Sequence, residues 1–444
     1  MVESSRQAIA FISDYANPTE ELGMEEAGGQ NVYVRQMAEN LATLGWQVDI
    51  FTRQTRPEAP PILQHSPHCR TIHLSAGPAQ FIPRHELFGY MPEFLAAFQA
   101  FQTKQAIRYP LIHTNYWLSA WVGLELQKAD NIQLIHTYHS LGVVKYATMA
   151  SRPAIAEMRL AIEQEILTQA NCIIATSPQE KETLRQWSPD QGQIEVIPCG
   201  TTANFHSIPK LEARQKLGWD PQEQVILYVG RFAPRKGIET LVRACADLKS
   251  QGKENFKLVL VGGSSSEQLD NTERKHIEHL VQALGLEEHT RFAGRVAHEW
   301  LPWYYSAADV CGIPSYYEPF GLVAIEAIAC GTPVVASKVG GLRFTILPEE
   351  TGLLVPPKDV TALSTALARV LEDELWAKKL KKQATHNPNQ RFSWKNSAMQ
   401  LSDLYRYILA RSIMHDQPWN PKISRLRSPL EVESEPLPLQ VAAF

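Results

Sequence analysis

The chain has 444 residues, a formal net charge of -4, 44% hydrophobic residues and 20% charged residues. This length is too great for one ordinary core and fits two domains of roughly 200 residues each. The net charge gives no overall attraction to nucleic acid or to an anionic membrane, so any recognition of phosphate must be local and the partner is expected to be a small molecule.

The six cysteines are scattered without metal-ligand spacing, and several lie in apolar runs. They are interpreted as small buried hydrophobic residues in a reducing compartment. The first seven residues have no basic flank and no long apolar segment, which argues against a signal peptide. No window approaches the roughly 18 apolar residues of a membrane span. We therefore expect a cytoplasmic protein without a membrane or nucleic-acid partner.

The chain opens with an apolar strand predicted at residues 8–13, a polar loop, and a helix predicted at residues 32–44 that leads into a second strand. Gly28 and Gly29 precede the helix, where they let a ligand approach the backbone, and Gln30 adds a polar side chain. A flexible turn before a helix is the alternative interpretation. The segment is not the Gly-x-Gly-x-x-Gly pattern of a dinucleotide site.

Five more strands are predicted in the first half, with helices between several of them, at residues 71–74, 111–113, 132–136, 171–176 and 194–197. This alternation predicts a doubly wound, Rossmann-like sheet that binds ligands at the carboxyl ends of its strands. His139 follows one such strand, although a structural role is the alternative for any single histidine. A helix from about residue 153 adds Arg152 and Arg159, and Arg159 with Glu163 also fits a simple i, i+4 pair.

The second half begins with a strand predicted at residues 224–229. Arg231 and Lys236 follow it and flank a glycine-bounded turn before the next helix. The planar fork of an arginine and the point charge of a lysine together match a diphosphate, and a solvated basic loop is the alternative. Gly263 lies in a turn after the strand predicted at residues 257–261, where it can bring further backbone N–H groups to the same edge.

A strand, loop, helix, strand unit at residues 311–337 carries two glutamates. Glu318 lies just before the helix predicted from about residue 322 to 330, and Glu326 lies about one and a half turns inside it. Unpaired N–H groups and partial positive charge at the helix start suit an anionic group such as a diphosphate. Two glutamates that merely cap and solvate a helix are the alternative.

These elements predict an α/β protein with an N-terminal domain at residues 1–205 and a C-terminal domain at residues 206–393. Helices are expected at about residues 360–371, 374–385 and 394–412, and the last is a candidate to pack back on the N-terminal domain. Residues 414–444 contain five prolines and no periodicity, so this tail is expected to be disordered.

Four motifs occur in order, namely Gly28-Gly29-Gln30-Asn31, His139-Ser-Leu-Gly142, Gly230-Arg231-x4-Lys236-Gly237 and Glu318-Pro-Phe-Gly-Leu-Val-Ala-Ile-Glu326. Together they resemble the retaining glycosyltransferases of the GT-B fold. The nearest resemblance is to the sucrose-phosphate synthases and related sucrose-forming enzymes, and it spans about residues 7–412. It implies two Rossmann-like domains that face each other across a cleft.

By this resemblance, the second half binds UDP-glucose as the donor. Arg231 and Lys236 would hold the diphosphate, Glu318 the glucosyl hydroxyls and Glu326 the ribose hydroxyls. The other donor-binding residues would be Gly263, Val296, Phe320, Gly321, Leu322 and Val323. The catalytic residues would be His139, Arg231, Lys236 and Glu318.

The resemblance implies fructose 6-phosphate as the acceptor, bound by the first half, with His139 at the 6-hydroxyl of the glucose. The acceptor-binding residues would be Gly28, Gly29 and Gln30 along the sugar, and Lys145, Arg152 and Arg159 around its phosphate. A separate sucrose-phosphate phosphatase would then be needed to release free sucrose.

Glucose transfer with retention to give sucrose 6-phosphate is the leading hypothesis. No obligatory cofactor or metal is expected, because no Asp-x-Asp motif lies near the strand ends, and Mg²⁺ would be at most stimulatory. The alternatives are a sucrose synthase that uses free fructose and a transferase that acts on an inositol phosphate. A non-catalytic sugar-nucleotide-binding regulator is the alternative from a different class.

Overall fold

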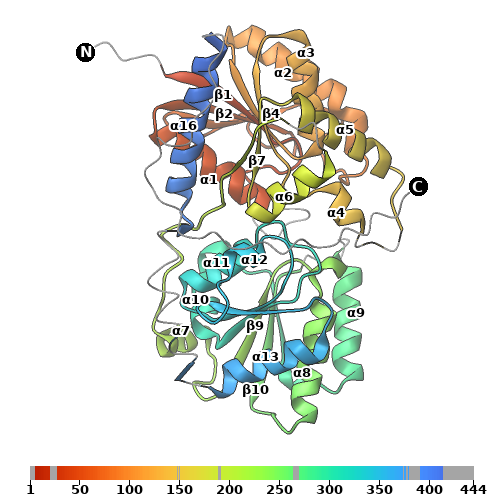
Figure 1. Cartoon of the computed structure of the whole chain (residues 1–444), viewed down its shortest axis with the longest axis vertical. Coiled ribbons are helices and arrows are strands. Elements are labelled where there is room, and N and C mark those ends of the chain that lie inside the picture. The colour runs from red at the N-terminus through yellow and green to blue at the C-terminus, as the bar shows by residue number, and fades with distance from the viewer. Residues whose placement is uncertain are drawn as a thin grey trace.

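The computed structural model describes residues 6–20, 28–147, 149, 151–188, 192–263, 270–373, 375–376, 379 and 391–413. Two α/β domains lie one above the other along the longest axis of the molecule (Figure 1). Most of the helix expected at residues 374–385, and the whole tail at 414–444, lie outside the described residues.

The N-terminal domain is built on a sheet with the strand order β3-β4-β2-β1-β5-β6-β7-β8. Its strands are β1 (Gln7–Ile12), β2 (Trp46–Arg53), β3 (Ile62–Ser66), β4 (Cys69–Leu74), β5 (Leu111–Asn115), β6 (Gln133–Thr137), β7 (Cys172–Ala175) and β8 (Ile194–Val196). All neighbours pair in parallel except β3, which pairs antiparallel with β4 at the edge. The sequence did not predict β3, because none of its residues is buried.

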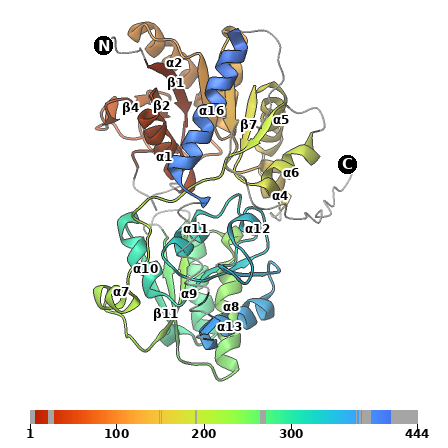
Figure 2. The same ribbon diagram turned by 60° about the vertical axis from the view of Figure 1, so that its left-hand side comes forward.

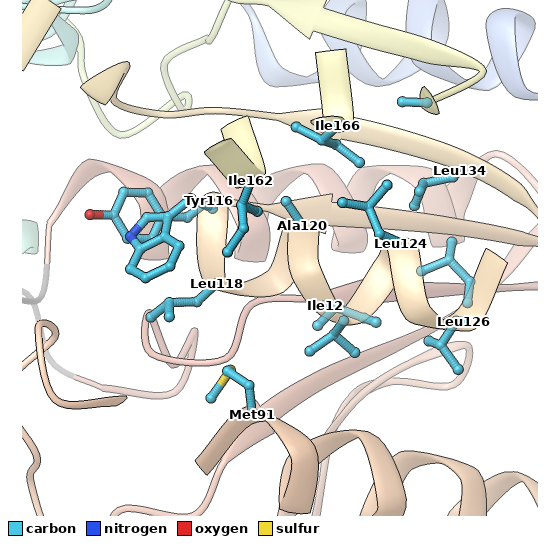
Figure 3. Packing of buried hydrophobic residues seen from close by; sticks show 14 of the residues in the cluster. Ile12, Met91, Tyr116, Leu118, Ala120, Leu124, Leu126, Leu134, Ile162 and Ile166 are labelled. Carbon is cyan, nitrogen blue, oxygen red and sulfur yellow. The ribbon is translucent and has the colours of Figure 1, made fainter. Parts of the chain in front are cut away.

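Helices cover both faces of this sheet (Figure 1). They are α1 (Gly29–Thr43), α2 (Met91–Gln105), α3 (Trp117–Ala129), α4 (Gly142–Ala147), α5 (Ala156–Gln169) and α6 (Pro178–Trp187), with a short 3-10 turn η1 at Leu87–Tyr90. Figure 3 shows part of one core, where Leu118, Leu124 and Ile166 are among the buried side chains packed around α3. Since both faces of the inner strands are covered, these strands appear in the sequence as continuous apolar runs.

The C-terminal domain has a wholly parallel sheet in the order β11-β10-β9-β12-β13-β14. Its strands are β9 (Gln224–Val229), β10 (Phe256–Val261), β11 (Thr290–Gly294), β12 (Val310–Ile313), β13 (Val334–Ser337) and β14 (Gly352–Val355). Its helices are α7 (Lys210–Leu217), α8 (Ile238–Ser250), α9 (Asp270–Ala283), α10 (Leu301–Ala307), α11 (Leu322–Ala329), α12 (Leu342–Thr345) and α13 (Val360–Glu372), with 3-10 turns η2 at Pro234–Lys236, η3 at Glu287–His289 and η4 at His298–Trp300.

The chain returns to the first domain through its last described helix, α16 (Trp394–Ile413). Figure 2 shows α16 running along the N-terminal domain beside α1. The indole Nε1 of Trp46 donates a hydrogen bond to Ser402 Oγ at 2.9 Å, and Tyr405 is fully buried. The described part of the N-terminal domain is therefore assembled from both ends of the chain.

The strand orders locate the place where each sheet can bind a ligand. In the first sheet the chain moves outward from β1 on one side and resumes at β5 on the other, and in the second sheet it does the same at β9 and β12. Such switch points open a crevice at the carboxyl ends of the strands. The residues that follow β1, β5, β9 and β12 therefore lie where the two domains can meet a common ligand.

Candidate active site

A cavity of about 350 Å³ lies between the domains and is lined by both of them. It brings together most residues that the sequence singled out, namely Gly28, Gly29, Gln30, His139, Lys145, Arg231, Lys236, Gly263, Val296, Glu318, Phe320, Gly321, Leu322, Val323 and Glu326. Arg152 and Arg159 are not among its lining residues. This cavity is called the cleft below.

Contacts between described residues of the two domains hold the two sides of the cleft together. The Leu141 N–H donates to the Tyr317 hydroxyl at 2.8 Å, and Ser177 Oγ donates to the Pro319 carbonyl at 3.5 Å. The start of α1 also lies against the start of α11, since a Cβ atom added to Gly29 would lie 3.1 Å from Leu322 Cδ1. The positive ends of two helices therefore meet at the cleft.

Lys236 and Glu318 form an ion pair on the C-terminal side of the cleft. Their side chains are 17% and 14% exposed, and Ser315 Oγ also donates to Glu318 at 3.4 Å. Burial lowers the pKa of Lys236, and the nearby Glu318 only partly opposes this. Burial alone would raise the pKa of Glu318, but Lys236 and Arg235 hold it below its ordinary value. The glutamate is therefore a carboxylate at neutral pH.

The turn that carries Lys236 is fixed against the loop after β12. Gly237 has φ 67°, and a Cβ atom there would collide with the Pro314 carbonyl oxygen, so both the backbone conformation and the space require glycine. The Tyr316 N–H donates to the Arg235 carbonyl at 2.8 Å. These contacts join two segments far apart in the sequence and set the position of the Lys236 ammonium beside Glu318.

Helix α11 places Glu326 and a row of backbone N–H groups at the cleft. Gly321 precedes the helix with φ 94°, a conformation that favours glycine, and the first N–H groups after it have no acceptor within the helix. Glu326 is 7% exposed and accepts a hydrogen bond from the Tyr305 hydroxyl at 2.9 Å, while His298 Nε2 lies 3.4 Å from its other oxygen. Glu326 is therefore oriented by neighbours rather than solvated.

Arg231, Gly263 and Val296 complete the predicted donor side. The Arg231 carbonyl accepts a hydrogen bond from the Tyr228 hydroxyl at 2.9 Å, which anchors the backbone after β9. Gly263 is buried beside Phe232, whose ring would lie 3.2 Å from an added Cβ atom. All three residues line the cleft with Glu326 and the start of α11.

On the acceptor side, the glycine loop is joined to α1 by reciprocal hydrogen bonds. The Gly28 N–H donates to Asn31 Oδ1 at 2.9 Å, and the Asn31 N–H donates to the Gly28 carbonyl at 3.0 Å. Gln30 is 9% exposed, accepts from the Tyr15 hydroxyl at 2.7 Å and donates to Ser13 Oγ at 3.2 Å. The Gln30 side-chain amide therefore stabilises the glycine loop, and a ligand at this loop would contact mainly the loop backbone.

His139 lies at the cleft in a left-handed conformation, with φ 58°. Its Nε2 is 2.9 Å from Asn115 Oδ1, and its ring packs edge to face against Tyr33 at 4.7 Å between centroids. Burial lowers its pKa to about 3, so the imidazole is neutral at physiological pH. Asn115 at the end of β5 and Tyr33 on α1 therefore hold the His139 side chain in one position.

Among the described residues, two cations line the acceptor side of the cleft, and the sequence predicted one of them. Lys145 lies on α4. Arg84 lies over the Tyr15 ring at 4.7 Å and was not predicted. It lies in an irregular segment without a strand or helix to mark it, and its aromatic neighbour comes from another loop. No local pattern in the sequence could have found it.

Arg159 and Arg152 are the two predicted acceptor-binding residues that do not line the cleft. Arg159 is 1% exposed and binds Glu163 at 2.7 Å, the Tyr116 hydroxyl at 3.0 Å and the Ser140 carbonyl at 2.5 Å. Through its hydrogen bond to the Ser140 carbonyl, Arg159 therefore stabilises the loop that carries His139 without lining the cleft. Arg152 is exposed and lies outside the lining of the cleft.

Within the described ranges, no group of three or more His, Cys, Asp or Glu side chains is arranged to hold a metal ion.

None of the helices in the described part of the chain is both long and apolar enough to cross a membrane.

Family models match both halves of the chain. Residues 28–200 match the glycosyl transferase 4-like domain, and residues 209–387 match the glycosyl transferases group 1. Curated relatives include two enzymes named D-inositol 3-phosphate glycosyltransferase. The one from Corynebacterium glutamicum is 34% identical over 90% of this chain and 97% of its own length, and the one from Corynebacterium kroppenstedtii is 36% identical over 91% of both. The chain belongs to this family of GT-B glycosyltransferases.

Solved structures narrow the resemblance within the family. The chain is 52% identical to a sucrose-phosphate synthase from Thermosynechococcus elongatus, with a TM-score of 0.85 over 91% of this chain and all of that one. This match confirms the resemblance that the four motifs predicted. The Anabaena protein HepE in complex with UDP and glucose shares the fold at 20% identity, with a TM-score of 0.71 over 90% of this chain and all of HepE.

Proposed function

We propose that this glycosyltransferase moves glucose from UDP-glucose to fructose 6-phosphate, with retention at C1, to give sucrose 6-phosphate. The observation that carries the proposal is the cleft, in which the Lys236–Glu318 pair and the start of α11 face the glycine loop and His139. The 52% identity to a sucrose-phosphate synthase supports this acceptor over the inositol phosphates named for relatives at 34–36% identity.

The donor half supplies positive charge where negative charge develops. Breaking the bond between C1 and the diphosphate oxygen leaves positive charge on the sugar ring and negative charge on the departing UDP. Arg231, Lys236 and the N–H groups at the start of α11 would stabilise that negative charge more strongly in the transition state than in the bound donor. Glu326, held by Tyr305, would accept hydrogen bonds from the ribose hydroxyls.

Glu318 is proposed to bind the glucosyl hydroxyls and to hold Lys236 in place until the donor arrives. As a carboxylate it accepts hydrogen bonds but does not donate them. A diphosphate beside Lys236 would add negative charge and counter the effect of burial on the lysine pKa. The ion pair therefore gives the lysine a partner in the empty cleft and a second partner in the loaded one.

The acceptor hydroxyl would attack C1 from the face that the diphosphate leaves. A new C1–O bond forms as the old one breaks, and the hydroxyl proton passes to the departing diphosphate oxygen. This same-face path accounts for retention without a covalent enzyme intermediate. The contacts that close the cleft, among them Leu141 to Tyr317, would exclude the water that otherwise hydrolyses the donor.

The phosphate of the acceptor would meet Lys145 and Arg84, which line the N-terminal side of the cleft. Arg159 is not assigned to the phosphate, because its hydrogen bonds go to Glu163, Tyr116 and Ser140. The glycine loop at Gly28 would follow the sugar. A transferase that acts on an inositol phosphate is the second candidate, supported by the names of the curated relatives.

The purified protein should be tested with UDP-glucose and with ADP-glucose against three acceptors, namely fructose 6-phosphate, free fructose and D-inositol 3-phosphate. Released nucleotide gives the rate, and mass analysis of the product gives the acceptor. We expect kcat/KM to be highest with fructose 6-phosphate. Equal rates with free fructose would overturn the assignment of the phosphate ester, and a preference for inositol phosphate would establish the second candidate instead.

A further inference from the structure

Asn115 ends β5 and is completely buried. Its side-chain Nδ2 lies 3.3 Å from the Ile12 carbonyl oxygen and 3.3 Å from the His113 carbonyl oxygen. Carbonyl oxygens only accept hydrogen bonds, so the atom that faces both of them must be the amide nitrogen. The orientation of the Asn115 amide is therefore determined by the surrounding backbone.

This orientation determines which nitrogen of His139 carries the proton. Asn115 Oδ1 can only accept, and it lies 2.9 Å from His139 Nε2, so Nε2 must be the donor. Burial lowers the pKa of His139 to about 3, which keeps the ring neutral at pH 7. A neutral imidazole has only one N–H group, so Nδ1 carries a lone pair.

The lone pair belongs to a ring that lines the cleft. In the described part of the structure, no protein atom forms a hydrogen bond with Nδ1. This nitrogen is not one of the fully buried polar atoms, so a ligand in the cleft can reach it. The edge-to-face contact with Tyr33 and the hydrogen bond between Nε2 and Asn115 limit rotation of the ring. Burial alone lowers the pKa of His139, and the neighbouring His113 and His136, which are also buried, have lowered pKa values and are neutral as well.

We propose that Asn115 is a positioning residue that fixes the Nε2–H tautomer of His139, and that the Nδ1 lone pair this presents to the cleft selects a donor sugar with a neutral 6-hydroxyl. The inference rests on the proposed function, because it requires a glucosyl donor with its 6-position at His139. A hydroxyl donates to the lone pair. The 6-carboxylate of a glucuronosyl donor has no proton to give and would be repelled, whereas a xylosyl donor would leave the nitrogen unpaired.

The first test examines the tautomer directly in the unmodified protein. With ¹⁵N-labelled histidine, the two ring nitrogens of His139 should show a protonated Nε2 and an unprotonated Nδ1 from pH 5.5 to pH 8, and His139→Gln assigns the signals by their loss. A protonated Nδ1, or titration within this range, would overturn the proposal. This measurement needs no substrate, so it is independent of the proposed function.

The second test changes the partner of Nε2. Asn115→Asp places a carboxylate beside Nε2, which favours the doubly protonated ring and turns Nδ1 into a donor. The ratio of kcat/KM for UDP-glucuronate to that for UDP-glucose should rise about 10- to 100-fold, the value of a hydrogen bond to a charged group. The same substitution in a His139→Ala background should leave the ratio unchanged.

Asn40→Asp is the matched control, because it adds the same charge on the partly buried flank of α1, where Asn40 Nδ2 donates to the Gln36 carbonyl at 2.8 Å. It should leave the ratio unchanged. A ratio unaltered by Asn115→Asp in a folded protein whose ¹⁵N spectrum shows a doubly protonated His139 would refute the proposal. If that variant does not fold, or if its His139 stays neutral, the tautomer measurement on the unmodified protein decides. Absence of transfer from UDP-glucose by the unmodified protein would instead count against the proposed function.

Discussion

The Lys236–Glu318 pair and the Arg159–Glu163 pair join the same kinds of charge on opposite sides of the cleft, but their surroundings differ. Arg159 and Glu163 are 1% and 0% exposed, and the remaining guanidinium and carboxylate atoms bind Tyr116, the Ser140 carbonyl and the Gly142 N–H. Lys236 and Glu318 keep 17% and 14% exposure and line the cleft. Burial and hydrogen bonding, rather than residue type, therefore distinguish the two pairs.

Because of this difference, only some of the charges near the cleft are available to bind a ligand. A pair whose donors and acceptors are already used stabilises the fold and has nothing to offer a substrate. Lys236 has three N–H donors, and Glu318 is its one hydrogen-bond partner among the described residues. Four substitutions test this division between polar groups that stabilise the fold and polar groups that bind a ligand.

The largest expected effect is on folding. Arg159→Ala would leave the Glu163 carboxylate buried without its partner, and burial already raises the pKa of Glu163. The free energy of unfolding in urea should fall by about 3–5 kcal/mol. Arg35→Ala, which removes a partly exposed i, i+4 pair with Glu39, is the control and should cost less than about 0.5 kcal/mol. Equal losses of stability in both variants would show that the buried Arg159–Glu163 pair stabilises the fold no more than a partly exposed pair does.

Lys236→Ala should act on turnover. Loss of a charge aimed at the departing diphosphate should lower kcat/KM by about 100- to 1,000-fold, which corresponds to about 3–4 kcal/mol. Steady-state kinetics with UDP-glucose measure the effect. Lys249→Ala on the surface of α8, where the ammonium only meets the Gly285 carbonyl, should leave kcat/KM within about twofold. Unchanged turnover in Lys236→Ala would remove the donor-site assignment.

The buried carboxyl group of Asp14 should make the stability of the fold depend on pH. Asp14 is 1% exposed, accepts a hydrogen bond from Ser119 Oγ and has one oxygen without a partner in the structure. Burial raises its pKa from 3.8 to about 7, although Ser119, Arg53 and Arg84 oppose this. The folded state therefore binds the proton more tightly, and this contribution to stability is full below about pH 4 and is lost as the pH rises through about 7.

Asp14→Asn mimics the protonated carboxyl and removes that titration. Between pH 5 and pH 8, the free energy of unfolding of the unmodified protein should fall by about 2.5 kcal/mol relative to that of the variant. Urea unfolding at the two pH values measures the difference. Parallel pH profiles for the two proteins would show that Asp14 is ionised throughout.

The smallest expected effect concerns α16. The Tyr405 hydroxyl hydrogen-bonds to His113 Nδ1, and His113 Nε2 lies 2.8 Å from Thr137 Oγ1. Tyr405→Phe leaves Nδ1 buried without a partner and should lower the free energy of unfolding by about 1 kcal/mol. KM for donor and acceptor should not change, and a raised KM would show that α16 also contributes to ligand binding.

Most of the fold was predictable because its inner strands are buried on both faces. The strand predicted at 224–229 corresponds to β9, and the helix predicted at 322–330 corresponds to α11 within one residue. The edge strand β3 was missed because none of its residues is buried and no apolar run marks it. A sequence pattern reports burial, so an element that buries little leaves little signal.

The site was predictable where motif residues lie on the loops after strands, as Arg231, Lys236 and Glu318 do. Arg159 shows the limit, because nothing in its spacing tells a cation that faces a cleft from one turned toward Tyr116 and Ser140. Arg84 shows the opposite case, since its position depends on the folding of loops that carry no periodic pattern. Such residues become visible only when distant segments are brought together.

The position of helix α16 affects the order in which the two domains can fold during synthesis. The apolar side of α1 and β2, including Trp46, remains uncovered until Trp394 and the residues after it have been made. At about 5–20 residues per second, a ribosome needs on the order of half a minute to reach them. Meanwhile the C-terminal sheet, whose described strands all lie between those two points, can form without waiting. The domain that is synthesised first is therefore the one completed last.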